Sequence, residues 1–227
     1  MKQRTTFFNF LQCALIVLLF LVVMPGYATE PFVNFRQGDL LLNRDGKVAI
    51  YVEPNAPRGV LIAARNLCED IRKVCGADAV ITPTKADAVV TIATREDGHW
   101  EQYRICANTH VVTITGSDRR GTIYGIYELS RQIGVSPWYW WADAPIAKHP
   151  KIYIKAGDYT DGEPAVKYRG IFINDESPSF TGWCKNKFGG VNSKMYSHMF
   201  ELLLRLKANY LWPAMLGNAF NEDDPES

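Results

Sequence analysis

Two short apolar segments near the C-terminal end of the chain lie on either side of one amphipathic helix. The first, Tyr168–Asn174, leads directly into Asp175 and Glu176, and the second, Asn209–Pro213, leads into the polar stretch Asn218–Asp224. Parallel neighbouring strands need a long crossover connection, which is usually a helix. A helix between these two segments therefore predicts that they pair as parallel strands. The spacing therefore predicts that acids and amides from both strands gather at one edge, where the strands end.

This β-α-β order is typical of the start of a (β/α)8 barrel, in which loops at the carboxyl ends of the strands form the site. Such a barrel takes about 250 residues, and only 60 residues extend from Tyr168 to Ser227. We therefore expect residues 168–227 to be the opening β-α-β portion of a truncated barrel. A chain that carries so little of the barrel is expected to be inactive alone.

The first 28 residues have the plan of a secretory signal peptide. Lys2 and Arg4 precede the apolar run Leu11–Met24, and Pro25–Ala28 supplies a helix breaker and small residues before a cleavage point. The run is shorter than the roughly 20 residues of a membrane-spanning helix. We expect removal of residues 1–28, export to the periplasm, the cell surface or the medium, and no stable membrane insertion. Retention of the segment as an anchor is the alternative.

Charge and cysteine content narrow the possible partners. The chain has 25 basic and 24 acidic residues and a net charge of +1. Nucleic-acid-binding proteins gather Lys and Arg on one face, so this balance argues against a nucleic-acid partner. No close Cys or His pair predicts a metal site, and no motif predicts a cofactor. Cys68 and Cys75 would lie about 10 Å apart on one helix, too far for a disulfide. These thiols, with Cys106 and Cys184, are expected to be small buried side chains.

Residues 29–157 predict a small α/β domain, followed by a linker at 158–167 that is rich in Gly, Asp and Pro. Alternation and helical spacing predict strands at 47–53, 79–82, 88–93, 103–107, 111–115 and 151–155, and helices at 60–74 and 120–133. In this order the helices cover one face of a mixed sheet. Gly76 is expected to end the first helix and Asp118 to cap the second.

Two motifs allow more than one interpretation. Gly116–Gly121 invites comparison with phosphate-binding loops, but its spacing matches neither the dinucleotide nor the P-loop fingerprint. This favours a turn in which Gly121 permits a close approach. The aromatic run Trp138–Trp141 could stack on sugar rings. We favour packing between domains, since side chains of an extended segment alternate and cannot all face one surface.

The candidate site lies where the two C-terminal strands end. Asp175 and Glu176 are the candidate catalytic carboxylates, because a carboxylate at a barrel mouth can act as general acid or base. Asp175 could instead cap the loop or pair with a basic residue such as Arg169. The acidic run Asn221–Asp224 could be a solvated surface. Substrate-binding contacts are expected from Asn174, Lys185, Trp212, Asn218 and Glu222.

Residues 183–190 are expected to form a loop whose Lys185 and Lys187 face a carboxylated substrate or solvent. A helix capped by Asn192 or Ser193 follows. Within it, His198 is expected to have a structural or exposed role. The buried stripe of this helix is predicted to contain Met195, Met199, Leu202, Leu203 and Leu206.

The sequence contains several long motifs: Tyr168–Glu176, Lys187–Gly190, Leu202–Met215 and Asn218–Pro225, with Gly116–Ile133 and Pro137–Pro145 before them. Together they resemble glycoside hydrolase family 115. Residues 116–133 also resemble the small α/β domain that precedes the barrel in β-hexosaminidases. The resemblance implies an α/β sandwich of that type followed by a (β/α)8 barrel.

Members of this family are xylan α-1,2-glucuronidases. The resemblance implies inverting removal of glucuronic acid, or its 4-O-methyl ether, from glucuronoxylan or xylo-oligosaccharides. Inversion uses a carboxylic acid and a carboxylate base, and the family places pocket residues of the first strand at Asp175 and Glu176. Leu216 stands where the family commonly carries tryptophan, so a stacking contact is lost there. A non-catalytic carbohydrate-binding or scaffold protein of the cell surface is the alternative function.

Overall fold

The computed structural model describes residues 30–213 and 215–226. The predicted signal peptide at residues 1–28 lies outside this range. From Pro31 onward the chain forms one compact unit. Within the described ranges, no helix combines the length and the apolar character that a membrane span requires.

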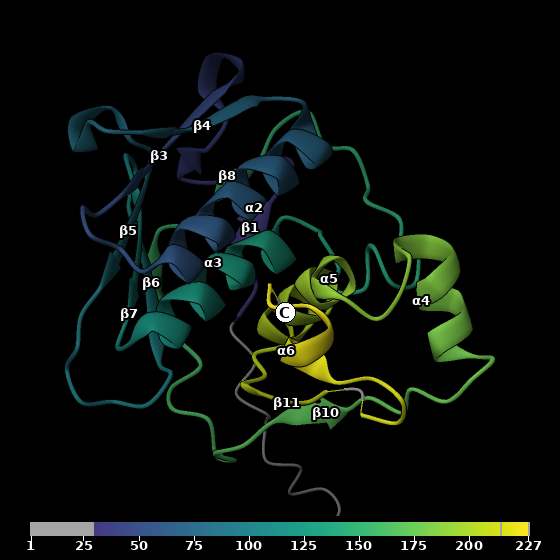
Figure 1. Cartoon of the computed structure of the whole chain (residues 1–227). Helices are drawn as coiled ribbons and strands as arrows, with labels where there is room; N and C mark the ends of the chain where they lie inside the picture. Colours follow the sequence, from purple (N-terminus) through teal and green to yellow (C-terminus); the bar gives the residue numbers. More distant parts are fainter. Residues whose placement is uncertain (1–29, 214, 227) are drawn as a thin grey trace, which may run out of the picture. The chain divides into compact units, whose positions relative to one another are not determined.

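A six-stranded mixed sheet forms the larger layer (Figure 1). Its order is β4-β3-β5-β7-β6-β9, in which β4, β3, β5 and β7 run parallel and β6 is antiparallel to both of its neighbours. The first five strands of this sheet in chain order, β3 to β7, match the predicted positions to within two residues. The strands are β3 (Lys47–Val52), β4 (Asp78–Thr82), β5 (Val90–Thr94), β6 (Tyr103–Ala107), β7 (Val112–Gly116) and β9 (Gly157–Tyr159).

Helices α2 (Arg58–Cys75) and α3 (Arg119–Gln132) cover the same face of this sheet, as predicted (Figure 1). They bury an aliphatic core that includes Ile50, Leu67, Ile92, Ile114 and Leu129, each no more than 1% exposed.

The predicted helix ends are also confirmed. Gly76 ends α2 in the left-handed conformation (φ 73°), which costs glycine little. Asp118 caps α3 by accepting a hydrogen bond from the Gly121 amide (2.7 Å). A Cβ at Gly121 would lie 2.1 Å from the Gln102 carbonyl oxygen, so this position requires a close approach, and the turn interpretation of Gly116–Gly121 holds.

The predicted strand at 151–155 joins a separate small sheet. There β8 (Tyr153–Ile154) lies between β1 (Val33–Asn34) and β2 (Leu40–Leu41). The next strand, β9, extends the main sheet and runs into the segment predicted as a linker. It is held there by Tyr159, which is buried and stacks on Phe32 with ring centroids 4.6 Å apart.

The C-terminal part contains two parallel strands with helices between them. Strand β10 (Gly170–Phe172) is followed by α4 (Phe180–Phe188) and α5 (Ser193–Arg205), and then by β11 (Tyr210–Trp212) and α6 (Phe220–Asp223). In the register, Gly170 lies opposite Tyr210 and Phe172 opposite Trp212. The predicted parallel pairing of the two strands is therefore confirmed.

Helix α4 corrects the prediction of a loop at 183–190. Phe180, Trp183, Cys184 and Phe188 recur at helical spacing, and Cys184 is fully buried. The helix ends at Gly189, which adopts a left-handed conformation (φ 88°). The prediction was wrong because Gly182 and the polar residues Lys185–Lys187 concealed a short apolar stripe.

Helix α5 begins as predicted at Asn192, whose side chain accepts from the backbone amides of Lys194 and Met195. Four of the five predicted stripe residues are buried. Leu206 is the exception at 42% exposure, since it lies one residue beyond the helix end. Tyr196 is fully buried and completes the stripe instead.

All four cysteines of the described part are free thiols. Cys68 and Cys184 are buried as expected, and Cys75 is partly buried. The expectation was wrong for Cys106, which is exposed because it lies on the outward-facing side of the alternating strand β6.

Candidate active site at the carboxyl ends of β10 and β11

Asp175 joins the loops that follow the two parallel strands. Its side chain is buried, and residue exposure is 2%. One carboxylate oxygen accepts a hydrogen bond from the Leu216 amide (3.0 Å), and the other accepts from the side-chain amide of Asn218 (2.5 Å). The structure therefore brings together Asp175 and Asn218, which are 43 positions apart in the chain.

These bonds decide the charge state of the Asp175 carboxyl. Burial alone would raise its pKa, but the hydrogen bonds from Asn218 and from the Leu216 amide outweigh burial and hold the pKa below its usual value. A carboxylate of this kind suits a general base or a residue that positions the loop. A general acid instead needs a raised pKa.

The two structural alternatives for Asp175 have different outcomes. Pairing with Arg169 is wrong, because Arg169 bonds to Glu101 at the opposite end of the strand. The loop-capping role agrees with the observed contacts, since Asp175 bonds the backbone of the loop after β11. Leu216 takes part through its backbone amide, and its side chain is 63% exposed.

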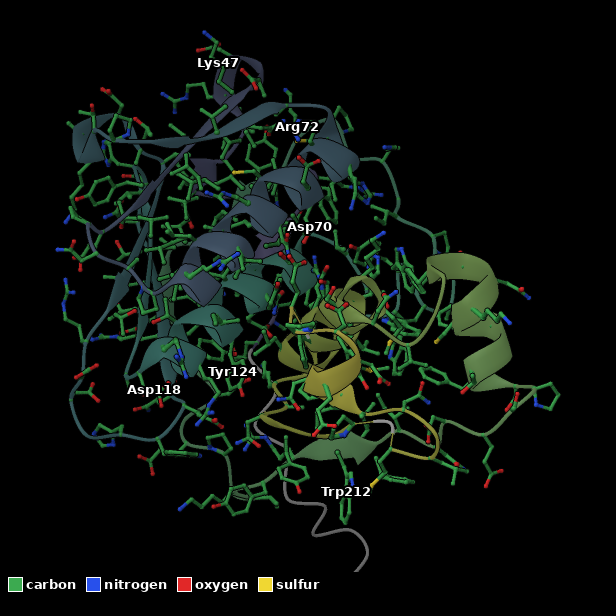
Figure 2. All side chains as sticks on the ribbon, viewed as in Figure 1. Lys47, Asp70, Arg72, Asp118, Tyr124 and Trp212 are labelled. Carbon is green, nitrogen blue, oxygen red and sulfur yellow. The ribbon has the colours of Figure 1, made fainter. Side chains whose placement is uncertain are left out.

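Three other predicted residues are exposed near these strand ends. Asn174 and Glu176 flank Asp175, and no hydrogen bond or ion pair occupies the Glu176 carboxylate within the part of the chain that the structure describes. Trp212 is 49% exposed, and its ring meets Phe172 edge to face at 5.6 Å. Its side chain projects from β11 away from α5 (Figure 2).

Two residues of the acidic run Asn221–Asp224 after β11 accept hydrogen bonds from backbone amides. Asp224 accepts a hydrogen bond from the Ser193 amide at the start of α5 (2.8 Å), and this bond lowers the pKa of Asp224. Asp223 accepts from the Ala219 amide at the start of α6 (2.7 Å). Glu222 is exposed, and no described residue bonds its carboxylate. The interpretation of a purely solvated run missed these two caps, of which the Asp224 cap depends on the tertiary position of Ser193.

The lysines expected near the substrate lie on α4. Lys185 is exposed, and no contact among the described residues joins it to Asp175 or Asn218. Lys187 lies over the Trp140 ring, with its Nζ 4.3 Å from the ring centroid.

The aromatic run Trp138–Trp141 packs mainly on α5. Trp140 stacks on the His198 ring with centroids 3.8 Å apart, and the indole N–H of Trp141 donates to the His198 carbonyl (3.2 Å). The Tyr139 hydroxyl donates to Glu201 (3.0 Å). These contacts confirm packing for three of the four residues, while Trp138 is 46% exposed. His198 has the structural role predicted, and burial lowers its pKa.

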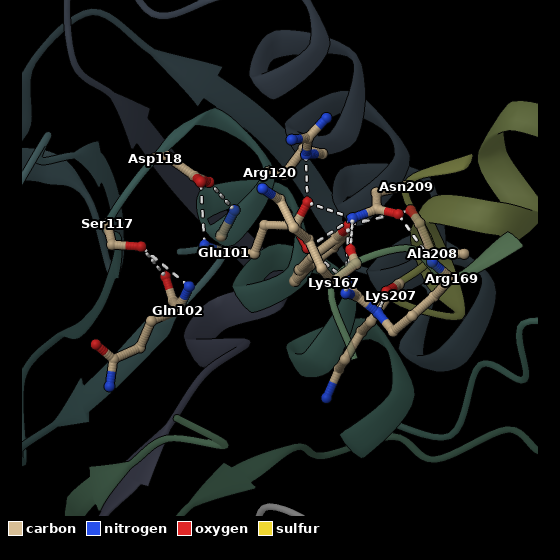
Figure 3. A network of polar contacts seen from close by, with 12 residues as sticks. Glu101, Gln102, Ser117, Asp118, Arg120, Lys167, Arg169, Lys207, Ala208 and Asn209 are labelled. Atoms are coloured by element: carbon tan, nitrogen blue, oxygen red, sulfur yellow. Dashed lines mark hydrogen bonds and ion pairs between the residues drawn. The ribbon is translucent and has the colours of Figure 1, made fainter. Parts of the chain in front are cut away.

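Glu101 contacts residues at the amino ends of both β10 and β11 (Figure 3). Its side chain is fully buried and forms ion pairs with Arg169, which precedes β10, and with Arg120 of α3. It also accepts from the side-chain amide of Asn209, which precedes β11 (3.0 Å). Arg169 and Asn209 bond each other through the Arg169 amide (3.0 Å). Sequence reasoning missed Glu101, since an isolated acid between strands gives no periodic signal.

Two further ionic contacts join the C-terminal part to α2 and α3. Arg205 of α5 is buried and pairs with the fully buried Asp70 of α2 at 2.8 Å. Lys207 pairs with the buried Glu128 of α3 at 3.0 Å and with Asp161. The start of the two-stranded sheet is thus fixed to the larger layer by charged side chains.

Most of the predicted site residues are exposed, with Asp175 as the buried exception. A cavity of about 410 Å³ lies at the start of β11, between α3 and α5, lined by Arg119, Arg120, Phe200 and Tyr210 among others. None of the predicted site residues lines it. Across residues 30–213 and 215–226, no three His, Cys, Asp or Glu side chains form a group that could hold a metal ion.

Comparison with known proteins shows what this chain is similar to. Residues 161–227 match the family model described as Glycosyl hydrolase family 115. The fold is similar to that of BtGH115A, a 4-O-methyl-α-glucuronidase of family GH115 described with specificity for decorated arabinogalactans, at 28% identity and a TM-score of 0.69. The similarity covers 81% of this chain and 26% of BtGH115A. A search of curated proteins found no match.

A second group of solved structures shares the mixed α/β fold. The β-hexosaminidase of Streptomyces plicatus is similar at 18% identity and a TM-score of 0.55, over 82% of this chain and 32% of that chain. The chain thus spans about a quarter to a third of the length of these two relatives. The resemblance to glycoside hydrolase family 115 is confirmed for residues 161–227, the stretch that carries the candidate site.

Proposed function

We propose that residues 168–226 open the (β/α)8 barrel of a glycoside hydrolase that removes α-1,2-linked glucuronic acid, or its 4-O-methyl ether, from a polysaccharide with inversion. The observation that carries the proposal is the parallel pairing of β10 with β11, joined at the carboxyl ends by Asp175 and Asn218. In barrel enzymes the reacting groups lie at this end of the strands. The match of residues 161–227 to the glycosyl hydrolase family supports the same conclusion.

The two carboxylates of the first loop would have different roles. Asp175 is held as an anion by Asn218 and Leu216, which suits a base or a group that orients the loop. Glu176 is exposed and can reach a substrate. An inverting pair is about 6.5–9.5 Å apart, which leaves room for the attacking water. We propose that further strands of the whole protein supply the remaining members of the site.

Asn174, Trp212, Asn218, Glu222 and Lys185 are the proposed substrate contacts. Trp212 offers an exposed aromatic face, and Glu222 and Asn174 offer exposed polar groups close to the strand ends. Lys185 lies on α4, where it could meet the carboxylate of the uronic acid only if the substrate extends over this helix.

Glucuronoxylan is the substrate that the family resemblance favours, and the specificity described for BtGH115A adds decorated arabinogalactan as a second candidate. We propose export through the N-terminal segment to meet such polymers outside the cytoplasm. We also propose that residues 1–227 alone do not turn over substrate, because a single β-α-β portion cannot enclose a sugar.

The test is release of uronic acid from both polymers, by this chain and by a protein extended with the coding sequence that follows in frame. We expect release from the extended protein only. In it, Asp175→Asn should lower kcat by about 100-fold or more. The control is Asp158→Asn, which changes an exposed carboxylate of β9 that pairs with Arg104 of the neighbouring strand β6 in the six-stranded sheet. An extended protein that releases no uronic acid, or that is indifferent to Asp175→Asn and Glu176→Gln, would contradict the proposal.

A further inference from the structure

The strand order of the six-stranded sheet reverses between β3 and β5. From β3 the chain crosses through α2 to β4 on one side, and β5 lies on the other side of β3 and leads toward β7. The first residues after β3 and β5, Glu53 and Arg95, are joined by an ion pair at the carboxyl ends of these strands. Open α/β sheets bind ligands in the crevice outside the carboxyl ends of their strands, at the point where the strand order reverses. A cavity of about 250 Å³ lies here.

This cavity combines an apolar floor with polar groups at its edge. Val60, Ile92 and Ala93 are buried and form the floor, and the edge carries Glu53 and Glu96. Each Glu53 carboxylate oxygen accepts one hydrogen bond of 2.5 Å from Arg95, and each can accept one more.

Two further polar groups at the edge have no partner among the described residues. The side chains of Asn55 and Glu96 form no hydrogen bond or ion pair there. The adjoining first turn of α2 begins at Pro57 without a side-chain cap from the described part of the chain. Acceptors and donors are thus available side by side around an apolar floor.

The same residues argue against two common ligands. A phosphate needs several backbone N–H groups in one turn, and this turn contains Pro54 and Pro57, which have none. The carboxylates of Glu53 and Glu96 would also repel it. A divalent cation is disfavoured because Arg95 already neutralises Glu53.

We propose that this crevice binds one neutral sugar ring. Its hydroxyl groups would bond Glu53, Asn55 and Glu96, and its C–H face would lie on the apolar floor. The cavity is smaller than the roughly 300–1,000 Å³ of sites for drug-sized ligands, so it accommodates a single ring. This site lies on the α/β layer, and its occupancy does not depend on the proposed hydrolysis.

The test is a two-dimensional amide NMR titration of the full chain with D-xylose, D-galactose, glycerol and inorganic phosphate, each as a separate probe. We expect saturable shifts with a sugar at the amides of Glu53, Asn55 and Ala56 and of residues 92–96, with a millimolar Kd. Glu53→Gln should weaken binding about tenfold, because it removes a charged hydrogen-bond acceptor. Ala56→Leu should abolish binding by filling the cavity, and its thermal melt reports whether the fold is kept.

The matched control is Asp158→Asn, since Asp158 also bonds an arginine of a neighbouring strand through both oxygens. It should leave sugar binding unchanged. The proposal is overturned if neither sugar gives saturable shifts, if phosphate or glycerol shifts the same amides as strongly, or if Asp158→Asn weakens binding as much as Glu53→Gln.

Discussion

The two sheets that contain parallel strands bury those strands to very different extents. In the six-stranded sheet, Ile50 and Ile92 are 0% and 1% exposed, whereas Phe172 and Trp212 of the two-stranded sheet are 57% and 49% exposed. Helices α2 and α3 and the strands themselves complete the first core. The second sheet has helix α5 on one face only, where Leu211 and Ile173 pack. Its other face displays aromatic side chains, and in the barrel that we propose these would face the interior.

The comparison shows that the smaller sheet depends on the larger one for its position. Its own apolar contacts lie on the α5 side, and polar contacts join this part to the larger layer: Arg205 with Asp70, and Arg169 with Glu101. The following substitutions test this dependence.

The largest effect is expected from Arg205→Met. The change leaves the buried Asp70 carboxylate without its cationic partner, and breaking a buried pair in this way costs about 3–5 kcal/mol. Unfolding in urea measures the loss. The double variant Asp70→Leu with Arg205→Met should recover much of it, since two apolar side chains then meet. A loss below 1 kcal/mol, the range of exposed pairs, would show that this contact does not hold the two parts together.

A smaller and more local effect is expected from Glu101→Gln. The variant removes the charge that Arg120 and Arg169 share, at a cost of about 1–3 kcal/mol. Hydrogen exchange should show faster exchange at the β10 and β11 amides, with β5 unchanged. The control Glu69→Gln alters an exposed pair with Arg72 and should change neither. Equal loss of protection in β5 and β10 would mean that Glu101 stabilises the whole unit instead.

The same contrast explains what could be predicted from the sequence. Strands such as 103–107, and the caps Gly76, Asp118 and Asn192, were predicted because alternation and capping are local signals. Helix α4 was missed because its apolar stripe is only four residues.

The candidate site was predictable only in part. The parallel pairing of β10 with β11 followed from the β-α-β spacing, and it brought Asp175 near Asn218. The roles of Glu101 and Asp224 were not predictable, because each contacts a residue that is distant in the chain. Contacts of this kind depend on tertiary packing, which no local pattern encodes.

A pH-dependent effect is expected from Asp175→Asn. The folded-state pKa of Asp175 lies below its usual value, so the carboxylate contributes stability above the unfolded pKa of about 3.9 and loses it as pH falls through the folded pKa. The variant should therefore be less stable than the parent by about 1 kcal/mol at pH 7. The difference should shrink below pH about 4, as urea unfolding across pH would show. A constant difference down to low pH would indicate that packing, and not charge, is responsible.

The smallest effect is expected from Phe172→Ala in this chain, because the ring is mostly exposed and such changes usually lie within about 0.5 kcal/mol. Ile92→Ala in the larger sheet is the contrasting control, with an expected cost of about 2–5 kcal/mol. In the extended protein, where we propose that further strands cover this face, Phe172→Ala should become as costly as a core truncation, about 3–5 kcal/mol. An effect that stays small in both proteins would show that the aromatic face remains uncovered, which is incompatible with a closed barrel.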